Sequence, residues 1–313
     1  MTTPSDYTPA PAADFVLSFD LANIAVRGRL VRLEAVSARA LSSHALPEAP
    51  SRVLGEVLAL SALLGSALKL DGRLTVQVQG SGPLDLIAAD YYGAEEDGAD
   101  GARPTGLRGY GRLDAERFAA LPANPDFAAL VGAGPGALAI TIEPRLGDNA
   151  YQGIVALNAG GIAPSAEDYF AQSEQLPTMI RLAAVPVLAP GKAPVWRAAG
   201  LMLQAVPGEA RDDDDWTRLG FILETLEAFE LIDTGLTAED LLWRLFNEDE
   251  VRVHPAEPLA FRCDCRAERI ASVLRAYAPE EREGLADADG IIRAKCEFCG
   301  TLHEIAPDAL AAD

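Results

Sequence analysis

Apolar and polar residues alternate in several short segments of the first two thirds of the chain. In residues 74–79 (Leu-Thr-Val-Gln-Val-Gln) every second side chain is apolar, and residues 138–142, 151–157 and 200–206 follow a similar pattern. A period of two is typical of β-strands that bury one face. Turn sequences such as residues 70–72 (Leu-Asp-Gly) join many of the strands, which favours antiparallel pairing. The pattern therefore predicts a largely antiparallel sheet.

One longer segment has the period of a helix. Residues 50–69 place Val53, Val57, Leu60 and Leu64 on one face, which is widened by Leu54, Leu58 and Leu68. A helix that is apolar over so much of its surface belongs in a core. With the strands it predicts an α+β core domain over residues 15–207, with helices packed on the sheet. We expect residues 1–14 to form a disordered tail and the acidic residues 92–104 a mobile loop.

Two further helices are predicted in residues 208–254, which we interpret as a helical linker. The first follows four aspartates at 212–215 and has Trp216, Leu219, Leu223, Leu226 and Phe229 on one side. The second follows a capping sequence at 237–240 and has Leu241, Leu242, Leu245 and Phe246. Short helices with apolar stripes are not stable alone in water, so we expect both to dock on the core. An ordinary helical connection between domains gives the same pattern.

The last segment, residues 255–313, is small and poor in apolar residues. We expect its core to consist of Leu259, Phe261, Ile270, Val273, Leu274, Tyr277, Leu285, Ile292, Phe298 and Leu302. A domain of fewer than about 60 residues with so little to bury usually needs a disulfide or a metal ion for stability.

All four cysteines of the chain lie in this segment, in the sequences Cys263-Asp264-Cys265 and Cys296-Glu297-Phe298-Cys299. Four thiolates are the ligand set of a tetrahedral zinc site, so we expect one Zn²⁺ per chain. Gly300 fits a knuckle after the second pair, because glycine readily takes a positive φ. His303 is a competing ligand that we place outside the ligand set. The same sulfurs can instead form two local disulfides, which is the chemistry of a zinc-thiolate redox switch.

The net charge argues against two classes of partner. The chain has 47 acidic and 26 basic residues, and residues 256–313 alone have twelve acidic against seven basic residues. Nucleic acids and anionic membranes are bound by neutralising phosphates, so we expect neither as a partner. The longest apolar stretch, residues 57–68, is too short to span a bilayer, and no targeting segment is recognisable. We expect a cytoplasmic protein, in which clustered cysteines are metal ligands more often than structural disulfides.

Enzyme signatures are missing from the sequence. The glycine-rich residues 132–136 precede a predicted strand, whereas a dinucleotide-binding loop precedes a helix. Gly191-Lys192 lacks the other residues of a phosphate-binding loop, so nothing supports the use of ATP. There is no G-x-S-x-G sequence, and His44, His254 and His303 are widely scattered. We expect a protein that is not an enzyme.

Several short motifs carry a resemblance to a known family. In the core domain they are residues 25–28, 70–72, 76–80, 151–153, 168–170 and 173–178, the last being Ser-Glu-Gln-Leu-Pro-Thr. The linker contributes residues 242–245 (Leu-Trp-Arg-Leu), and the last domain contributes 261–265 and 296–300 around the cysteines. With these motifs the chain resembles the 33 kDa chaperonin family of redox-regulated heat-shock holdases over nearly its whole length after about Phe19. The tail and an acidic insertion near Glu95 depart from the family without touching a motif.

This resemblance implies a mechanism. Under reducing conditions the four cysteines would hold zinc, the last domain would be folded and the linker docked. Oxidants would form the disulfides Cys263–Cys265 and Cys296–Cys299 with release of zinc. Structural zinc contributes on the order of 10 kcal/mol to folding, and disulfides across one or two residues do not replace it. The last domain and the linker would unfold and expose a surface that holds unfolding client proteins without ATP, which prevents their aggregation under oxidative stress.

The resemblance also implies partners: client proteins, a second copy in a homodimer on activation, and ATP-dependent refolding chaperones that receive the clients. The linker residues expected to dock on the core or to bind clients are Trp216, Leu219, Leu223, Leu226, Phe229, Leu242, Trp243 and Leu245. One alternative is a thiol–disulfide oxidoreductase that uses Cys296 and Cys299. It is disfavoured because the pair lacks a preceding strand and a following helix that would lower a thiol's pKa. A structural zinc protein with a scaffolding role is a third interpretation.

Overall fold

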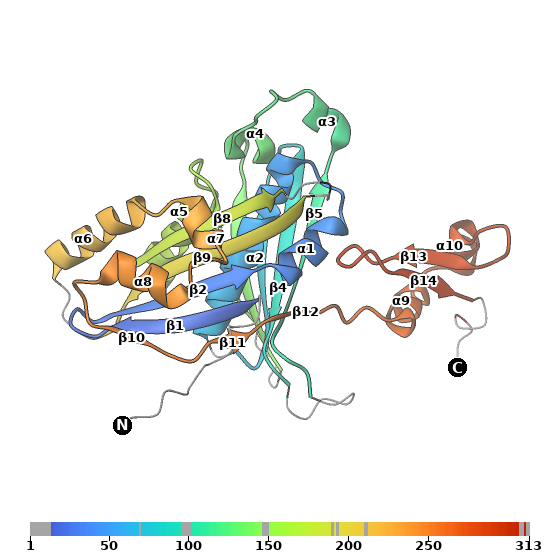
Figure 1. Ribbon diagram of the computed structural model, residues 1–313. Helices are drawn as coiled ribbons and strands as arrows, with labels where there is room; N and C mark the ends of the chain where they lie inside the picture. The colour runs from blue at the N-terminus through green and yellow to red at the C-terminus, as the bar shows by residue number, and fades with distance from the viewer. Residues whose placement is uncertain are drawn as a thin grey trace.

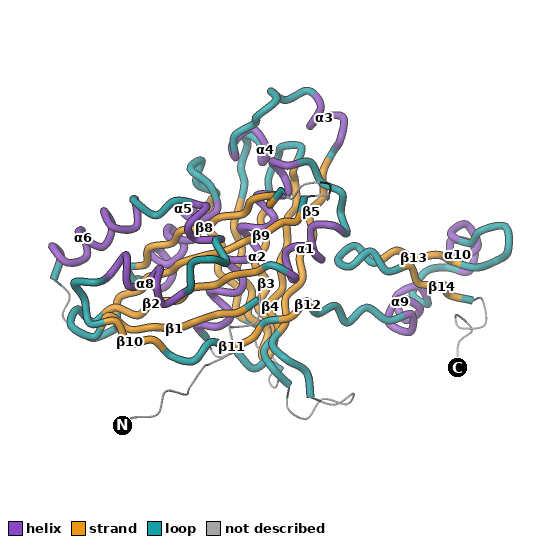
Figure 2. Tube along the Cα trace, viewed as in Figure 1, coloured by secondary structure: helices purple, strands orange, loops and turns teal. Residues whose placement is uncertain are grey.

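The computed structural model describes residues 14–68, 70–95, 102–145, 150–188, 191, 194–209, 212–306 and 310. A large body of sheets and helices has a small C-terminal lobe at one side (Figures 1 and 2). Most of the expected disordered tail, and residues 96–101 of the expected mobile loop, lie outside the described residues. Asp14 corrects the tail prediction, because it is buried and its carboxylate accepts hydrogen bonds from the N–H groups of Glu34 and Val36.

The strands of the large body form two six-stranded sheets within the described part of the chain. The first has the order β10 (Val251–Val253), β1 (Phe15–Leu21), β2 (Val26–Leu33), β9 (Val195–Ala205) and β8 (Thr178–Val187), and β11 (Glu257–Pro258) also pairs with β1. The second has the order β12 (Ala260–Phe261), β5 (Gly106–Leu113), β4 (Leu84–Tyr92), β3 (Gly72–Gln79), β6 (Ala137–Pro144) and β7 (Tyr151–Ala156). The strands pair antiparallel apart from β12 with β5, so the predicted α+β class is confirmed.

Helix α2 (Glu48–Ala67) lies between the two sheets and joins them into one core (Figure 1). Its buried residues, among them Leu54, Leu58 and Leu63, occur all around the helix, as expected of a helix in a core. Gly55 allows a close approach, because a Cβ atom there would lie 2.5 Å from Cβ of Ala184. Further helices of this body are α1 (Ala35–Ser42), α3 (Ala115–Ala119), α4 (Phe127–Val131), α5 (Ile162–Tyr169) and the π-helix η1 (Phe170–Glu174).

The predicted linker forms α6 (Asp213–Glu224), α7 (Ala228–Ile232) and α8 (Ala238–Phe246) against the first sheet (Figure 1). A second apolar cluster joins these helices to β1, β2, β8 and β9, and it buries Leu219, Leu223 and Leu242. Arg32 of β2 adds a polar contact, since its buried guanidinium donates to the carbonyl oxygen of Leu231 at 2.9 Å. The helices are therefore docked on the sheet, as the apolar stripes predict.

One detail of the linker prediction is wrong. The first helix ends at Glu224, and Leu226 and Phe229 do not continue it. The reason is a capping box between Glu227 and Glu230, which starts α7 as a separate helix. Phe229 is consequently 67% exposed. Trp243, expected to take part in docking or client binding, is 68% exposed and is not part of the cluster beneath the linker, so its role in client binding stays a prediction.

The small lobe contains α9 (Ala267–Leu274), α10 (Pro279–Leu285), β13 (Ile292–Lys295) and β14 (Leu302–Ile305). Its apolar cluster consists of Ala271, Leu274, Ile292, Ile305 and Leu310, with Ile270, Ala286 and Ala294 beside them. Four expected core residues are instead exposed, namely Val273, Tyr277, Leu285 and Leu302. The expected core residues Leu259 and Phe261 pack in the large body, because β11 and β12 join its sheets. The lobe thus buries even less apolar surface than the sequence suggests.

Candidate metal centre

The first cysteine pair directly follows an edge strand of the large body. Strand β12 pairs in parallel with β5, and the N–H group of Arg262 donates to the carbonyl oxygen of Leu107 at 2.9 Å. The Arg262 side chain is buried and forms ion pairs with Glu95 and Asp264. Cys263 and Cys265 are therefore held on the large body by backbone and side-chain contacts.

The second pair lies on a knuckle between β13 and β14. The N–H group of Cys296 donates to the carbonyl oxygen of Thr301, and the N–H group of Gly300 donates to that of Cys296, each at 2.8 Å. Gly300 has φ 71°, a conformation that other residues rarely take, so the predicted role of this glycine is confirmed. The knuckle directs Cys296 and Cys299 toward the first pair.

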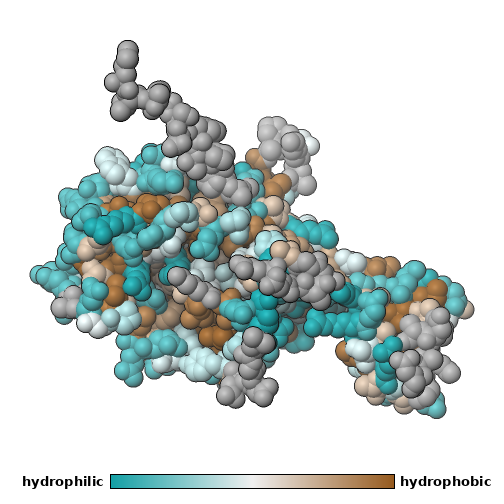
Figure 3. Space-filling model, turned by 90° about the horizontal axis from the view of Figure 1, so that it is seen from below, coloured by the Kyte–Doolittle hydropathy of each residue, from teal (hydrophilic) through white to brown (hydrophobic). Residues whose placement is uncertain are grey.

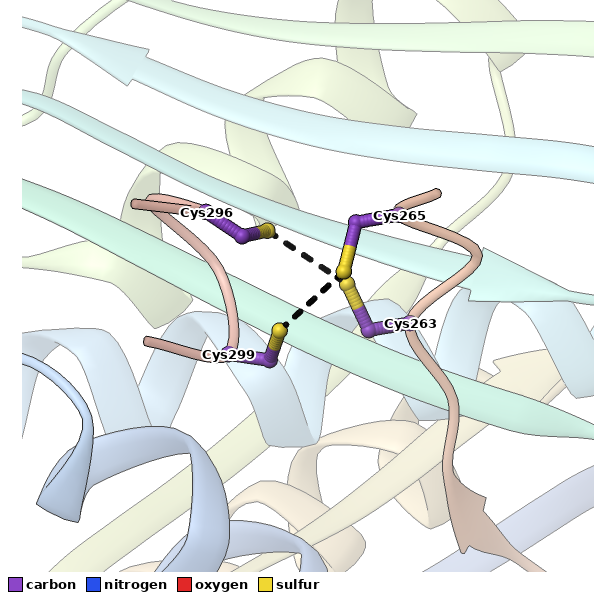
Figure 4. Close-up of side chains that lie close together, drawn as sticks. All are labelled: Cys263, Cys265, Cys296 and Cys299. Atoms are coloured by element: carbon purple, nitrogen blue, oxygen red, sulfur yellow. Dashed lines mark hydrogen bonds between the residues drawn. The ribbon is translucent and has the colours of Figure 1, made fainter. Parts of the chain in front are cut away.

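The four sulfur atoms meet in one cluster (Figure 4). They all lie within 4.8 Å of one another, with Cys263 Sγ 3.7 Å from Cys296 Sγ and Cys265 Sγ 3.3 Å from Cys299 Sγ. A tetrahedral site with metal–sulfur bonds of about 2.3 Å has sulfur–sulfur edges of about 3.8 Å. The cluster is thus positioned to bind one metal ion, and all four cysteines are free thiols. His303 lies on β14 and does not belong to this cluster.

The thiols differ in their ease of deprotonation. Burial raises the pKa of Cys263 and of Cys265, and the neighbouring cysteines add to the rise at Cys265. Burial also acts on Cys299, but hydrogen bonds with the hydroxyl and N–H groups of Thr301, together with those to Cys265 and Cys296, outweigh it and lower the pKa of Cys299 to about 6. Four thiolates close together repel one another, which opposes ionisation of all four thiols. A bound cation offsets this repulsion.

The structure corrects one argument against the oxidoreductase alternative. A strand, β13, does precede Cys296, whereas a second strand and not a helix follows Cys299. The low pKa of Cys299 comes from hydrogen bonds with Thr301 and the neighbouring cysteines, and not from a helix N-terminus. Cys296 and Cys299 therefore have the preceding strand, which the sequence analysis found missing, but not the following helix.

Sequence reasoning missed the residues of the large body that contact this centre. Arg39 of α1 donates to the carbonyl oxygen of Cys299 at 3.2 Å, and Nη1 of Arg108 lies 3.8 Å from Cys263 Sγ. Arg103 forms an ion pair with Asp264 at 2.9 Å. No local pattern marks these arginines, which lie more than 150 residues from their partners in the sequence.

The linker helices α6 to α8 lie on the first sheet, away from the small lobe (Figure 1). Leu219, Leu223 and Leu242 are buried there, and Trp216, Leu226 and Leu245 pack at the edge of the same cluster. Their role in client binding stays a prediction. Across the described ranges no helix is long and apolar enough to cross a lipid bilayer.

Comparisons with known proteins give a consistent result. Residues 14–306 match the family model described as Hsp33 protein. A 33 kDa chaperonin from Caulobacter vibrioides is 39% identical over 300 residues, which cover 94% of this chain and 95% of that protein. One from Escherichia coli is 36% identical over 290 residues, 93% of this chain and 91% of that protein. The crystal structure of a 33 kDa chaperonin from Thermotoga maritima superposes with a TM-score of 0.76 at 23% identity, and covers 95% of this chain and 96% of that one.

Proposed function

The chain belongs to the Hsp33 family, and from this premise we propose that it is an ATP-independent holdase whose four cysteines form an oxidation-sensitive zinc switch. Family membership supports the chaperone activity. The observation that supports the switch is the cluster of four free cysteines, which joins the large body to a lobe with little else to stabilise it.

Zinc is the metal we propose for the cluster. Four thiolates in a tetrahedral arrangement suit Zn²⁺, and a closed set of four protein ligands is typical of a structural site. Bound zinc would tie the first cysteine pair to the knuckle and so stabilise a lobe whose apolar cluster is small. Cys263, Cys265, Cys296 and Cys299 are the proposed ligands, with one ion per chain.

Oxidation would remove this stabilisation. Formation of the disulfides Cys263–Cys265 and Cys296–Cys299 withdraws two electrons from each pair and leaves no thiolate to bind a cation. Each new bond spans one or two residues and restrains the unfolded chain very little. We therefore propose that the region after residue 255, except the strands on the large body, unfolds when the cysteines are oxidised.

Undocking of the linker is the proposed link to client binding. Helices α6 to α8 cover an apolar face of the first sheet that includes Leu17, Phe19 and Leu201. If the linker undocks, that face and the linker residues Trp216, Leu219, Leu223, Leu226, Phe229, Leu242, Trp243 and Leu245 become available to unfolding proteins. Phe229 and Trp243, already exposed, would be accessible before activation.

The proposal includes the cellular setting that the family suggests. We infer a cytoplasmic protein that dimerises when activated and passes clients to ATP-dependent chaperones. The charge of −21 opposes binding of nucleic acids or anionic membranes.

One paired assay separates this function from the alternatives. Reduced and oxidised samples of the same preparation are tested for suppression of client aggregation and for reduction of insulin. A holdase suppresses aggregation after oxidation and does not reduce insulin. Insulin reduction without aggregation suppression would support the oxidoreductase, which the strand before Cys296 and the lowered pKa of Cys299 favour. Inactivity in both assays would leave a structural zinc protein.

A further inference from the structure

The surface of the large body next to the metal centre contains a buried ion pair. Arg108 of β5 and Asp90 of β4 bond at 2.7 Å, and their side chains are 13% and 4% exposed. Asp90 also accepts a hydrogen bond from the Thr75 hydroxyl at 2.7 Å. The Arg108 guanidinium is thereby fixed in position on the sheet, with one face directed away from it.

That free face of Arg108 meets the knuckle of the small lobe. Its guanidinium carbon lies 3.9 Å from the centre of the Phe298 ring, which belongs to the second cysteine sequence. Nη1 of the same group lies 3.8 Å from Cys263 Sγ of the first pair. Tyr110, two residues further along β5, packs on Phe298 with ring centres 5.9 Å apart. A single arginine of the large body thus contacts both halves of the cysteine cluster.

We propose that Asp90, Arg108 and Tyr110, with Arg39, form a docking surface for the Cys296–Gly300 knuckle, and that Arg108 is a positioning residue for the metal centre. This inference rests on the proposed zinc site, and it assigns the surface of the large body on which the knuckle docks. Stacking of Arg108 on Phe298 holds the knuckle where its two sulfurs complete the cluster, beside Cys263 of the first pair. Metal affinity in the full chain therefore depends on a residue outside the metal-binding lobe.

Metal binding and docking of the knuckle are coupled, and coupling is reciprocal, so metal binding in turn strengthens the contact between Phe298 and Arg108. A knuckle folded around a metal keeps Phe298 over Arg108 and holds the lobe on the sheet. Oxidation of the cysteines removes the fold that presents Phe298, so the lobe loses this attachment as well as its own structure.

The test is a competition titration of zinc against a chromophoric chelator with reduced, full-length protein. Arg108→Gln and Phe298→Leu should each weaken zinc affinity about three- to tenfold, the size expected of a partly desolvated cation–π contact. Phe298→Leu should have a smaller effect in the Arg108→Gln background than in wild type, because both changes remove the same contact. Arg108→Lys keeps the charge beside Asp90 and lacks only the planar stacking group. It should also weaken zinc binding, and it replaces Arg108→Gln in the test if that variant disturbs the core.

Arg112→Gln is the matched control. Arg112 lies on the same strand, its side chain is 58% exposed, and its ion pair and hydrogen bonds are with Asp85. This variant should bind zinc within twofold of wild type. Equal affinity of wild type, Arg108→Lys and Phe298→Leu, or strictly additive effects in the double variant, would overturn the inference while leaving the zinc site in place. A wild type that binds no zinc would instead refute the proposed function.

Discussion

At the scale of single residues, each cysteine is placed by an identifiable device. Cys263 and Cys265 follow a strand whose N–H and carbonyl groups pair with β5, whereas Cys296 and Cys299 depend on the positive φ of Gly300. The result is a set of four sulfurs within 4.8 Å of one another, positioned to bind one metal ion. The chemistry of the centre therefore comes from four side chains and two backbone arrangements.

A change of ligands tests this set directly. Cys296→Ser/Cys299→Ser should reduce zinc from one ion per chain to none in reduced protein, because two thiolates do not form a closed structural site. His303→Ala should keep one ion, since His303 lies outside the cluster. Metal analysis with a thiol count after chelation checks both. Retention of zinc by the double variant would refute the ligand assignment.

The four-cysteine cluster could be predicted from sequence, and the arginines near it could not. The chain has only four cysteines, and they form two close pairs, so the sequence alone identifies the set. Arg39 and Arg108 are two of many arginines, and only the packing of the lobe on β5 and α1 brings them to the sulfurs. Contacts between residues so far apart in the sequence produce no periodic pattern from which they could be predicted.

At the scale of elements, local periodicity was a good guide wherever an element is long. The strands near residues 74–79 and 138–142 and helix α2 were all expected, because burial imposes periods of two and 3.6 on them. The two-residue strands β11 and β12 are too short to show any period. Their assignment to the last domain was wrong for this reason, and it moved Leu259 and Phe261 to the wrong core.

Loosening the linker should activate the protein without an oxidant. Leu223 of α6 is fully buried in the cluster beneath the linker, so Leu223→Ala should cost about 2–5 kcal/mol of docking free energy. That is comparable with the stability of a small docked unit. The reduced variant, with zinc bound, should then suppress light scattering by a thermally unfolding client.

The control for this variant lies on the same helix. Phe221 is 64% exposed, and Phe221→Ala should change docking by no more than about 0.5 kcal/mol and leave the reduced protein inactive. If circular dichroism shows that Leu223→Ala loosens the linker and the reduced variant still does not protect the client, undocking is not the activating step.

The central helix also predicts a pH effect. Burial raises the pKa of Glu56 on α2 from 4.5 to about 7, against a smaller lowering by Arg52. The folded state therefore binds this proton more tightly than the unfolded state, so stability falls as pH rises from 4.5 to 7 and the loss is complete above that. Glu56→Gln removes the charge, and because the residue is only half-buried we expect a gain of about 1–3 kcal/mol at pH 8.

Thermal unfolding at pH 4.5 and pH 8 checks the effect. The gain of Glu56→Gln should be small at pH 4.5 and large at pH 8. Glu48→Gln makes the same charge change at the exposed start of α2 and should not gain stability at either pH. Equal gains at both pH values would show that Glu56 does not titrate as described.

At the scale of the whole molecule, stability is distributed unevenly. The large body has an apolar core shared by two sheets and α2, whereas the lobe at the right of Figure 3 has only a small cluster. We therefore expect the free energy of folding in the lobe to come largely from the proposed metal and from contact with the body. The proposed division into a stable part and a switchable part rests on the amount of apolar surface that each one buries.

Chelation should reveal this division in reduced protein. Removal of zinc should abolish hydrogen-exchange protection in β13 and β14 and leave the amides of α2, β3 and β9 protected. The N–H groups of Cys296 and Gly300, which form the knuckle, are the most informative probes. Protection of the lobe that survives chelation would show that metal is not its main source of stability.

The central claim is that one event at the cysteines both releases the metal and activates the chaperone. The direct measurement is an oxidant titration of the reduced protein in which zinc release and suppression of client aggregation are followed on the same samples. We predict that the two curves coincide, with neither zinc release nor activity before oxidation and with both reversed by reduction and added zinc. Activity in the reduced, zinc-bound protein, or complete zinc release without any protection of the client, would contradict the claim.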